Sequence, residues 1–118
     1  MINSENNIVN AEDYSIILTT IDTNQKAKKI AHKLIELHLV ACVQIDKICS
    51  IYFWKHNICK SNEYRLMIKT MNINYEKVEQ VIRQFSNYDN PQVVQLKLTN
   101  GSNEYLNWIS DSCKKKHN

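Results

Sequence analysis

Residues 50–70, SIYFWKHNICKSNEYRLMIKT, decide how this chain folds. The first half is apolar on both sides, because Ile51 and Phe53 point to one side of an extended chain and Tyr52 and Trp54 point to the other. A sheet in a small protein commonly buries one face and exposes the other to water. The stretch therefore predicts a β-hairpin whose second apolar face must be covered by something outside its own sheet.

The composition predicts one folded domain. The chain has 118 residues, of which 43% are hydrophobic and 23% are charged, values typical of a globular protein. A single Gly and a single Pro predict ordered elements joined by short connections. We expect a flexible leader over residues 1–13, one domain over residues 14–113, and a basic tail over residues 114–118.

The charge pattern argues against several classes of partner. The net charge is only +3, and no basic stripe is interleaved with aromatic residues, so no nucleic acid is expected. No apolar run approaches the roughly 20 residues of a membrane span, so no membrane is expected either. The first residues show no charged segment followed by an apolar one, so we expect no export signal, and the four cysteines form no Cys-x-x-Cys pair. We therefore expect reduced thiols and a cytoplasmic location.

Short runs rich in β-branched residues alternate with longer segments whose apolar residues recur every three or four positions. The predicted elements are, in order, a strand at 14–20, a helix at 22–39, strands at 41–56 and 63–70, a helix at 72–85, a strand at 92–99, and a helix at 100–116. The alternation of apolar and polar residues along the strand at 41–56 is interrupted at 46–48, which predicts a β-bulge. Residues 57–62 are the predicted turn. In the last helix, Ser102 is the expected N-cap, and the inner stripe is Tyr105, Trp108, Ile109 and Ser112.

The order β-α-β-β-α-β-α predicts an α+β fold of the ferredoxin-like sandwich type. Two helices should cover one face of a four-stranded antiparallel sheet, with 14–20 and 63–70 in the centre and 41–56 at an edge. The strand at 41–56, taken as fifteen residues, would span roughly 50 Å, whereas a compact globule of this size is roughly 35 Å across. The hairpin must therefore project, and we expect a partner chain in a closed symmetric assembly to cover it.

Five motifs occur in order along the chain: LVACVQI, SIYFW, LMIKT, YDNPQVV and NGSNEYLNWI. In these motifs the chain resembles the CutA family of divalent-cation tolerance proteins, over residues 14–109. The resemblance implies a ferredoxin-like subunit in a homotrimer, with hairpins paired between subunits. It also implies a non-enzymatic role in tolerance of, or response to, divalent metal ions such as copper.

The chain departs from the family where its copper-linked bacterial member has a cysteine and paired histidines. Those positions are Thr19, Phe85 and Ser86 here, which are poor ligands for a soft metal. The family's proline–tyrosine turn begins with Asn87, and its usual glutamate is Gln92. We therefore expect no required cofactor, and at most weak binding of a divalent metal such as copper.

Three residues match family positions and are candidates for a cleft between subunits: Trp54, Lys69 and Tyr88. Lys69 is the candidate contact for a small anion. The alternative is a packing role for the two aromatic residues and a solvated lysine. His56 and Cys59 are weak metal candidates, since a complete site needs three or four ligands; the alternative is an exposed histidine and a surface thiol.

Enzymatic motifs are missing from the sequence. The single Gly101 excludes a glycine-rich phosphate loop, and no nucleophile elbow occurs. Two alternatives to the metal-tolerance function remain: a small-ligand or anion sensor similar to the PII signalling proteins, and a structural trimeric scaffold. Scarcity of Gly and folding coupled to assembly also predict a thermostable protein.

Overall fold

The secondary structure follows the predicted order in the computed structural model, which describes residues 9–114. The elements are β1 (Tyr14–Ile21), α1 (Asn24–Glu36), β2 (Val40–Trp54), β3 (Asn57–Met71), α2 (Tyr75–Phe85), β4 (Val93–Lys97) and α3 (Asn103–Ser112), with short 3₁₀ turns at Ala11–Asp13 and Asn72–Asn74. Within the described residues, none of the helices is both long and apolar enough to cross a bilayer.

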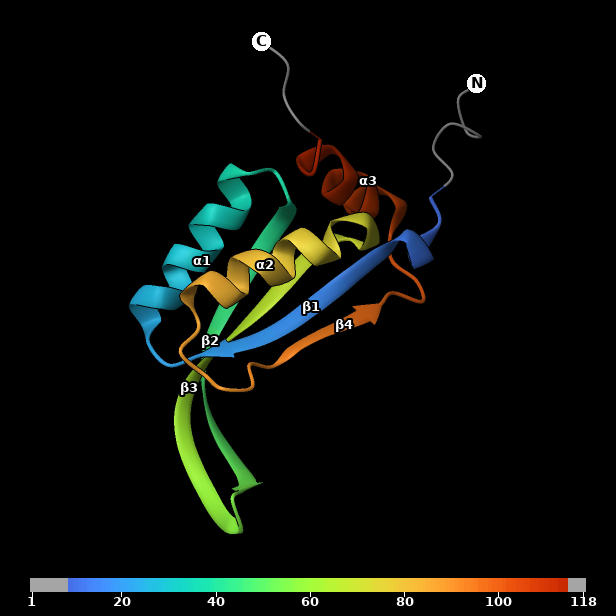
Figure 1. Cartoon of the computed structure of the whole chain (residues 1–118). Coiled ribbons are helices and arrows are strands. Elements are labelled where there is room, and N and C mark those ends of the chain that lie inside the picture. Colours follow the sequence, from blue (N-terminus) through green and yellow to red (C-terminus); the bar gives the residue numbers. More distant parts are fainter. Residues whose placement is uncertain (1–8, 115–118) are drawn as a thin grey trace, which may run out of the picture.

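The four strands form one antiparallel sheet in the order β2-β3-β1-β4. The first and third strands are central and the second is at an edge, as predicted. Helices α1 and α2 lie side by side over one face, and α3 lies at the end of the sheet away from the hairpin (Figure 1). The predicted ferredoxin-like α+β fold is confirmed.

The main core lies between the sheet and the helix pair. Helix α1 begins where the Thr23 side chain accepts a hydrogen bond from the Lys26 backbone N–H at 3.1 Å. Its inner residues Ala27, Ile30 and Leu34 are fully buried against the sheet. Burying a Leu or Ile side chain stabilises the fold by about 1.5–3 kcal/mol, so this layer holds the sheet rigid beneath the functional surface.

A smaller core at the end of the sheet holds α3. Leu106 and Ile109 are buried there against Tyr14. The predicted inner stripe of α3 is wrong in part: Ile109 is buried as predicted, but Tyr105 and Trp108 are 39% and 45% exposed. Ser102 is the N-cap as predicted, but the chain enters the helix so that the positions next to Tyr105 and Trp108 face inward.

The hairpin of β2 and β3 is longer than expected. Pairing runs without interruption from Cys42–Lys69 to Trp54–Asn57, and the molecule measures 60 × 33 × 21 Å (Figure 1). The turn is formed by Lys55 and His56, whose φ angles are 49° and 68°; it is not the predicted 57–62 segment. The bulge lies between Val40 and Cys42, not at 46–48. At residues 46–48 the side chains of β2 still alternate between the two faces of the sheet. The apolar–polar pattern of the sequence changes at this point because the hairpin leaves the domain.

The folded body begins before the predicted boundary at Tyr14. Val9 and Ala11 pack against the α3 core, and the Asn10 side chain accepts a hydrogen bond from the Glu12 N–H. Residues 1–8 and 115–118 lie outside the described residues, so the leader and tail stay predictions there.

Candidate functional site

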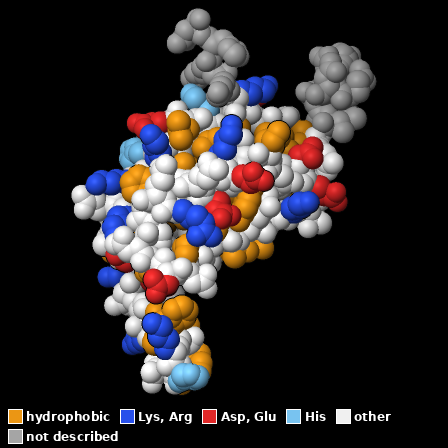
Figure 2. Space-filling model, in the orientation of Figure 1, with side chains coloured by type: hydrophobic (Ala, Val, Ile, Leu, Met, Phe, Trp, Pro, Cys, Tyr) orange, Lys and Arg blue, Asp and Glu red, His pale blue; other side chains and the backbone are white. Residues whose placement is uncertain are grey.

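Both faces of the projecting hairpin carry exposed apolar side chains. On the helix side, Ile51, Phe53 and Ile58 are 69%, 68% and 78% exposed. On the opposite side, Tyr52 and Trp54 are 43% and 40% exposed. Hydrophobic side chains are visible on the projecting hairpin in the space-filling view (Figure 2). The subunit alone therefore leaves this part of the sheet uncovered.

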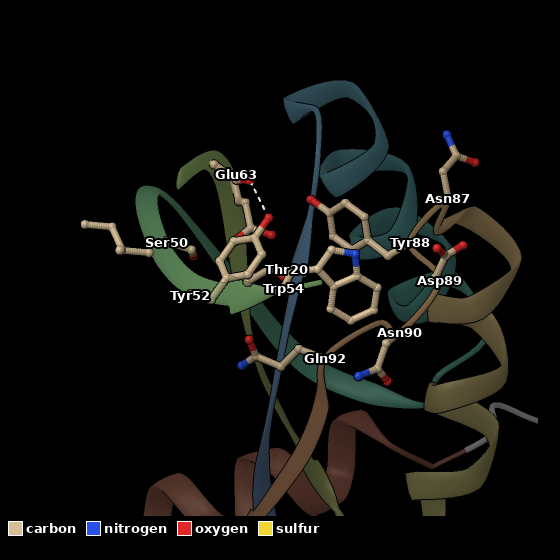
Figure 3. A pocket seen from close by; sticks show the side chains of 12 residues that line it. Thr20, Ser50, Tyr52, Trp54, Glu63, Asn87, Tyr88, Asp89, Asn90 and Gln92 are labelled. Carbon is tan, nitrogen blue, oxygen red and sulfur yellow. Dashed lines mark hydrogen bonds between the residues drawn. The ribbon is translucent and has the colours of Figure 1, made fainter. Parts of the chain in front are cut away.

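A cavity of about 650 Å³ lies beside the hairpin where it leaves the domain, between β2, β3 and the loop that leads into β4. We call it the hairpin pocket. It is lined by Thr20, Ser50, Ile51, Tyr52, Trp54, Ser61, Glu63, Asn87, Tyr88, Asp89, Asn90 and Gln92. Figure 3 shows the rings of Tyr52, Trp54 and Tyr88 bordering this one space.

The alternation of the strands brings one wall of the pocket together. Ser50, Tyr52 and Trp54 are two residues apart along β2, so they project from the same face. Ser61 lies opposite Ser50 on β3. The Tyr52 and Ser61 hydroxyl groups are 2.7 Å apart, within hydrogen-bond distance, which ties the two arms together at the pocket.

The loop between α2 and β4 supplies the facing wall. Directly after α2, the Ser86 hydroxyl accepts a hydrogen bond from the Tyr88 backbone N–H at 3.2 Å, which fixes the turn. Burial raises the pKa of the Tyr88 hydroxyl, and the neighbouring Glu63 carboxylate raises it further. Tyr88 therefore presents a protonated hydroxyl to the pocket at neutral pH.

The hairpin pocket is aromatic and acidic. Glu63 is only 8% exposed, and Asp89 contributes a second carboxylate to the lining. Within the described part of the chain, no Lys, Arg or His lines the cavity. Its chemistry therefore differs from the anion contact expected from the sequence.

The structure brings two of the three predicted cleft residues together. Trp54 and Tyr88 line the hairpin pocket, whereas Lys69 lies toward α3, where its Nζ donates to the Tyr105 hydroxyl at 3.0 Å. Two further pocket residues, Tyr52 and Glu63, were not predicted from the sequence. For Tyr52 the signal was its two-residue spacing from Trp54, but Glu63 becomes a pocket residue only through the tertiary fold.

The metal candidates do not form a site within one chain. His56 lies in the hairpin turn, and the Cys59 thiol lies 3.8 Å from the Asn57 carbonyl oxygen. Within residues 9–114, no three His, Cys, Asp or Glu side chains gather closely enough to hold a metal ion. Thr19, which was matched to a metal position of the family from the sequence, is fully buried.

Positive charge gathers on α1 instead. A shallow hollow of about 410 Å³ is lined by Gln25, Lys28, Lys29, His32, Lys33, Glu36 and Phe85. It lies on the helix side of the sheet, on the far side of the main core from the face that carries Tyr52 and Trp54. An anion attracted to these lysines would therefore bind away from the hairpin pocket.

The chain matches a known family model over most of its length. Residues 15–112 match the model described as CutA1 divalent ion tolerance protein. A probable divalent-cation tolerance protein, a cutA homolog of Encephalitozoon cuniculi, is 32% identical over 97 residues, which cover 82% of this chain and 84% of that protein.

Solved structures agree with the sequence comparison. The CutA1 described as a stable protein from the psychrotrophic bacterium Shewanella sp. SIB1 is 37% identical with a TM-score of 0.81, over 85% of this chain and 94% of that one. The periplasmic divalent cation tolerance protein CutA from Archaeoglobus fulgidus is 27% identical with a TM-score of 0.83, over 86% and 99% of the two chains. The family model, which spans residues 15–112, includes the hairpin as well as the domain body.

Proposed function

This chain belongs to the CutA1 divalent ion tolerance family, and we propose that it acts without catalysis, as a homotrimer, in tolerance of divalent metal ions such as copper. The observation that carries the proposal is the projecting hairpin, with exposed apolar residues on both faces. Long apolar edge strands promote aggregation unless they are covered. Closed symmetric association of copies buries such a strand in a defined way.

The open face of the sheet supports the same assembly. Val94 and Leu96 on β4 are 43% and 49% exposed, and they pair with Leu18 and Ile16 on β1. This apolar surface lies on the side of the sheet opposite α1 and α2. Neighbouring copies that accept each other's hairpins would cover it together with the exposed residues of β2.

The contribution to metal tolerance is proposed to be indirect. Thr19, Phe85 and Ser86 stand at the metal positions of the copper-linked relative, and a threonine, a phenylalanine and a serine bind copper poorly. Elemental analysis of the purified protein is expected to show less than one copper or zinc per subunit. One equivalent retained through purification without added metal would contradict an indirect role.

The cellular experiment compares growth in graded copper concentrations. Host cells without a CutA protein would make the wild-type chain, the Phe53→Asp variant or no chain. We expect the wild type alone to extend growth to higher copper, because the charge in Phe53→Asp prevents assembly. Equal growth of all three cultures would overturn the proposed function.

The hairpin pocket favours a second function, that of a small-ligand sensor resembling the PII signalling proteins. A thermal-shift screen separates the two, because a sensor melts at a higher temperature when its ligand is bound.

We also propose a thermostable protein, with a midpoint above the roughly 45–65 °C of ordinary domains. The Shewanella relative is described as a stable protein.

We propose a cytoplasmic location because all four cysteines are free. The Archaeoglobus relative is described as periplasmic, so fractionation of cells that make the full chain is the test. Recovery of the chain outside the cytoplasm would contradict this location.

A further inference from the structure

Residues 48–54, ICSIYFW, contain no charged residue, no Pro and no Gly. They form the end of β2 and lie between Lys47 and Lys55. Isoleucine, tyrosine, phenylalanine and tryptophan are all enriched in strands. Uncharged stretches of six or seven such residues are the sequence signature of segments that stack between chains into cross-β fibrils.

The backbone of this segment is paired on one side only. In the sheet order β2-β3-β1-β4, β2 is an edge strand, and residues 48–54 pair with residues 57–63 of β3. Among the described residues, no strand pairs with the other edge of β2. The unpaired N–H and C=O groups on that edge can therefore bind an identical strand of another copy.

The side chains of the segment are also open to a second copy. Ile51 and Phe53 are 69% and 68% exposed on the helix side of the hairpin. The hairpin projects beyond α1 and α2, so the subunit's own helices do not cover these side chains (Figure 1). Stacked copies could interdigitate them in the dry interface that joins two sheets of a fibril.

The other strands do not combine a free edge with such a sequence. β1 (Tyr14–Ile21) also lacks charged residues, but β3 and β4 pair with its two edges. β4 has a free edge, but it is only five residues long and ends with Lys97. In the folded subunit, residues 48–54 are therefore the segment at which such pairing would begin.

We infer that residues 48–54 nucleate cross-β association between subunits that are not assembled. The partner is the same segment of a second copy, paired along the free edge of β2. The inference goes beyond the proposed function, because the closed assembly proposed above would cover this segment, whereas a fibril would extend it without limit.

Thioflavin T fluorescence of the full-length protein over time tests the inference. Light scattering first finds the guanidinium chloride concentration at which the chains are monomeric, or shows that none is needed. Under that condition we expect wild-type fibrils with diffraction at about 4.7 Å and about 10 Å. Soluble monomers, or amorphous aggregates without these reflections, would overturn the inference. Fibrils from a chain that is monomeric in plain buffer would support it and contradict the proposed trimer.

The Ile51→Lys variant places a charge within the segment. The matched control is Ile73→Lys, the same substitution at an 86% exposed residue in the 3₁₀ turn after β3. We expect Ile51→Lys to lengthen the lag before fibrils form at least about tenfold, and Ile73→Lys to leave it unchanged. Equal lag times for the two variants would contradict the inference.

Mass spectrometry of wild-type fibrils after protease treatment locates the ordered segment directly, and it decides the question if circular dichroism shows that Ile51→Lys is unfolded. The protected core should contain residues 48–54. A core that contains residues 14–21 without residues 48–54 would place the nucleus in β1 and overturn the inference.

Discussion

The hydroxyl groups of Tyr52 and Ser61 lie 2.7 Å apart, on opposite arms of the projecting hairpin. This contact joins the two functional features of the molecule, because both residues line the hairpin pocket and both lie on the segment proposed to enter a partner subunit. The proposed assembly and the proposed small-ligand binding therefore share one surface, and substitutions there are expected to separate their contributions.

Trp54→Ala should weaken the trimer far more than the fold of the subunit. Trp54 is 40% exposed in the single chain, and truncating a large aromatic residue that becomes buried costs about 3–5 kcal/mol. The measurement is light scattering over a dilution series, with circular dichroism as the check on folding. The control is Ile73→Ala, which removes an 86% exposed apolar side chain away from the hairpin. Identical dilution curves for the two variants would mean that a partner subunit does not cover Trp54.

Thr19→Val should stabilise the protein by about 1 kcal/mol. Among the described residues, the Thr19 hydroxyl is buried without a hydrogen-bond partner, and an apolar group of the same shape removes that penalty. The matched variant is Thr70→Val, which loses a 2.6 Å hydrogen bond to the Leu39 carbonyl oxygen. It should destabilise by about 1–3 kcal/mol in denaturant unfolding. If both variants changed the free energy of unfolding in the same direction, the Thr19 hydroxyl would not be the unsatisfied group and the Thr70 hydroxyl the satisfied one.

The double substitution Lys55→Asn, His56→Gly should raise the thermal midpoint. Both residues have positive φ angles, and a two-residue hairpin turn of this kind favours Asn-Gly. The expected gain is about 1 kcal/mol, from relief of backbone strain. The matched control, Lys60→Asn with Asn62→Gly, places the same residues in extended parts of β3 and should lower the midpoint. A lower thermal midpoint for the turn variant would contradict the expected relief of strain at Lys55 and His56.

Tyr88 should make stability depend on pH in alkaline solution. Burial, followed by Glu63, raises its pKa in the folded state above the ordinary value of 10.0. The unfolded chain therefore loses this proton first. The protonated Tyr88 hydroxyl therefore contributes fully to the free energy of unfolding below about pH 10, and this contribution is lost as the pH rises further. The difference in unfolding free energy between wild type and Tyr88→Phe should shrink as the pH rises above about 10, and a constant difference would contradict the raised pKa.

The order of elements and the pairing of strands were predictable because they follow from local periodicity. The position of the hairpin turn was not, since Lys55 and His56 are unusual at positive φ, whereas the Asn and Ser residues of 57–62 are typical of turns. The inner face of α3 was predicted correctly at Ile109 but missed Leu106, because Tyr105 and Trp108 also satisfy a helical spacing with Ile109. Only the packing against Tyr14 selects Leu106 and Ile109.

The candidate site was less predictable than the fold. Trp54 and Tyr88 were found through motif resemblance, and they do line one pocket. Lys69 is separated from Glu63 by six residues of extended strand, roughly 20 Å, so a shared cleft with Trp54 and Tyr88 would need another subunit. The acidic character of the pocket depends on Glu63, which no local pattern marks.

The mass of the purified protein in solution tests the central claim most directly. Light scattering at micromolar concentration should give about 42 kDa, three copies of the 13.9 kDa chain in a closed assembly. Hairpins that cover one another's apolar faces require an oligomer, and three copies is the number that the family resemblance implies. A stable, folded monomer of 13.9 kDa at the same concentration would contradict the account.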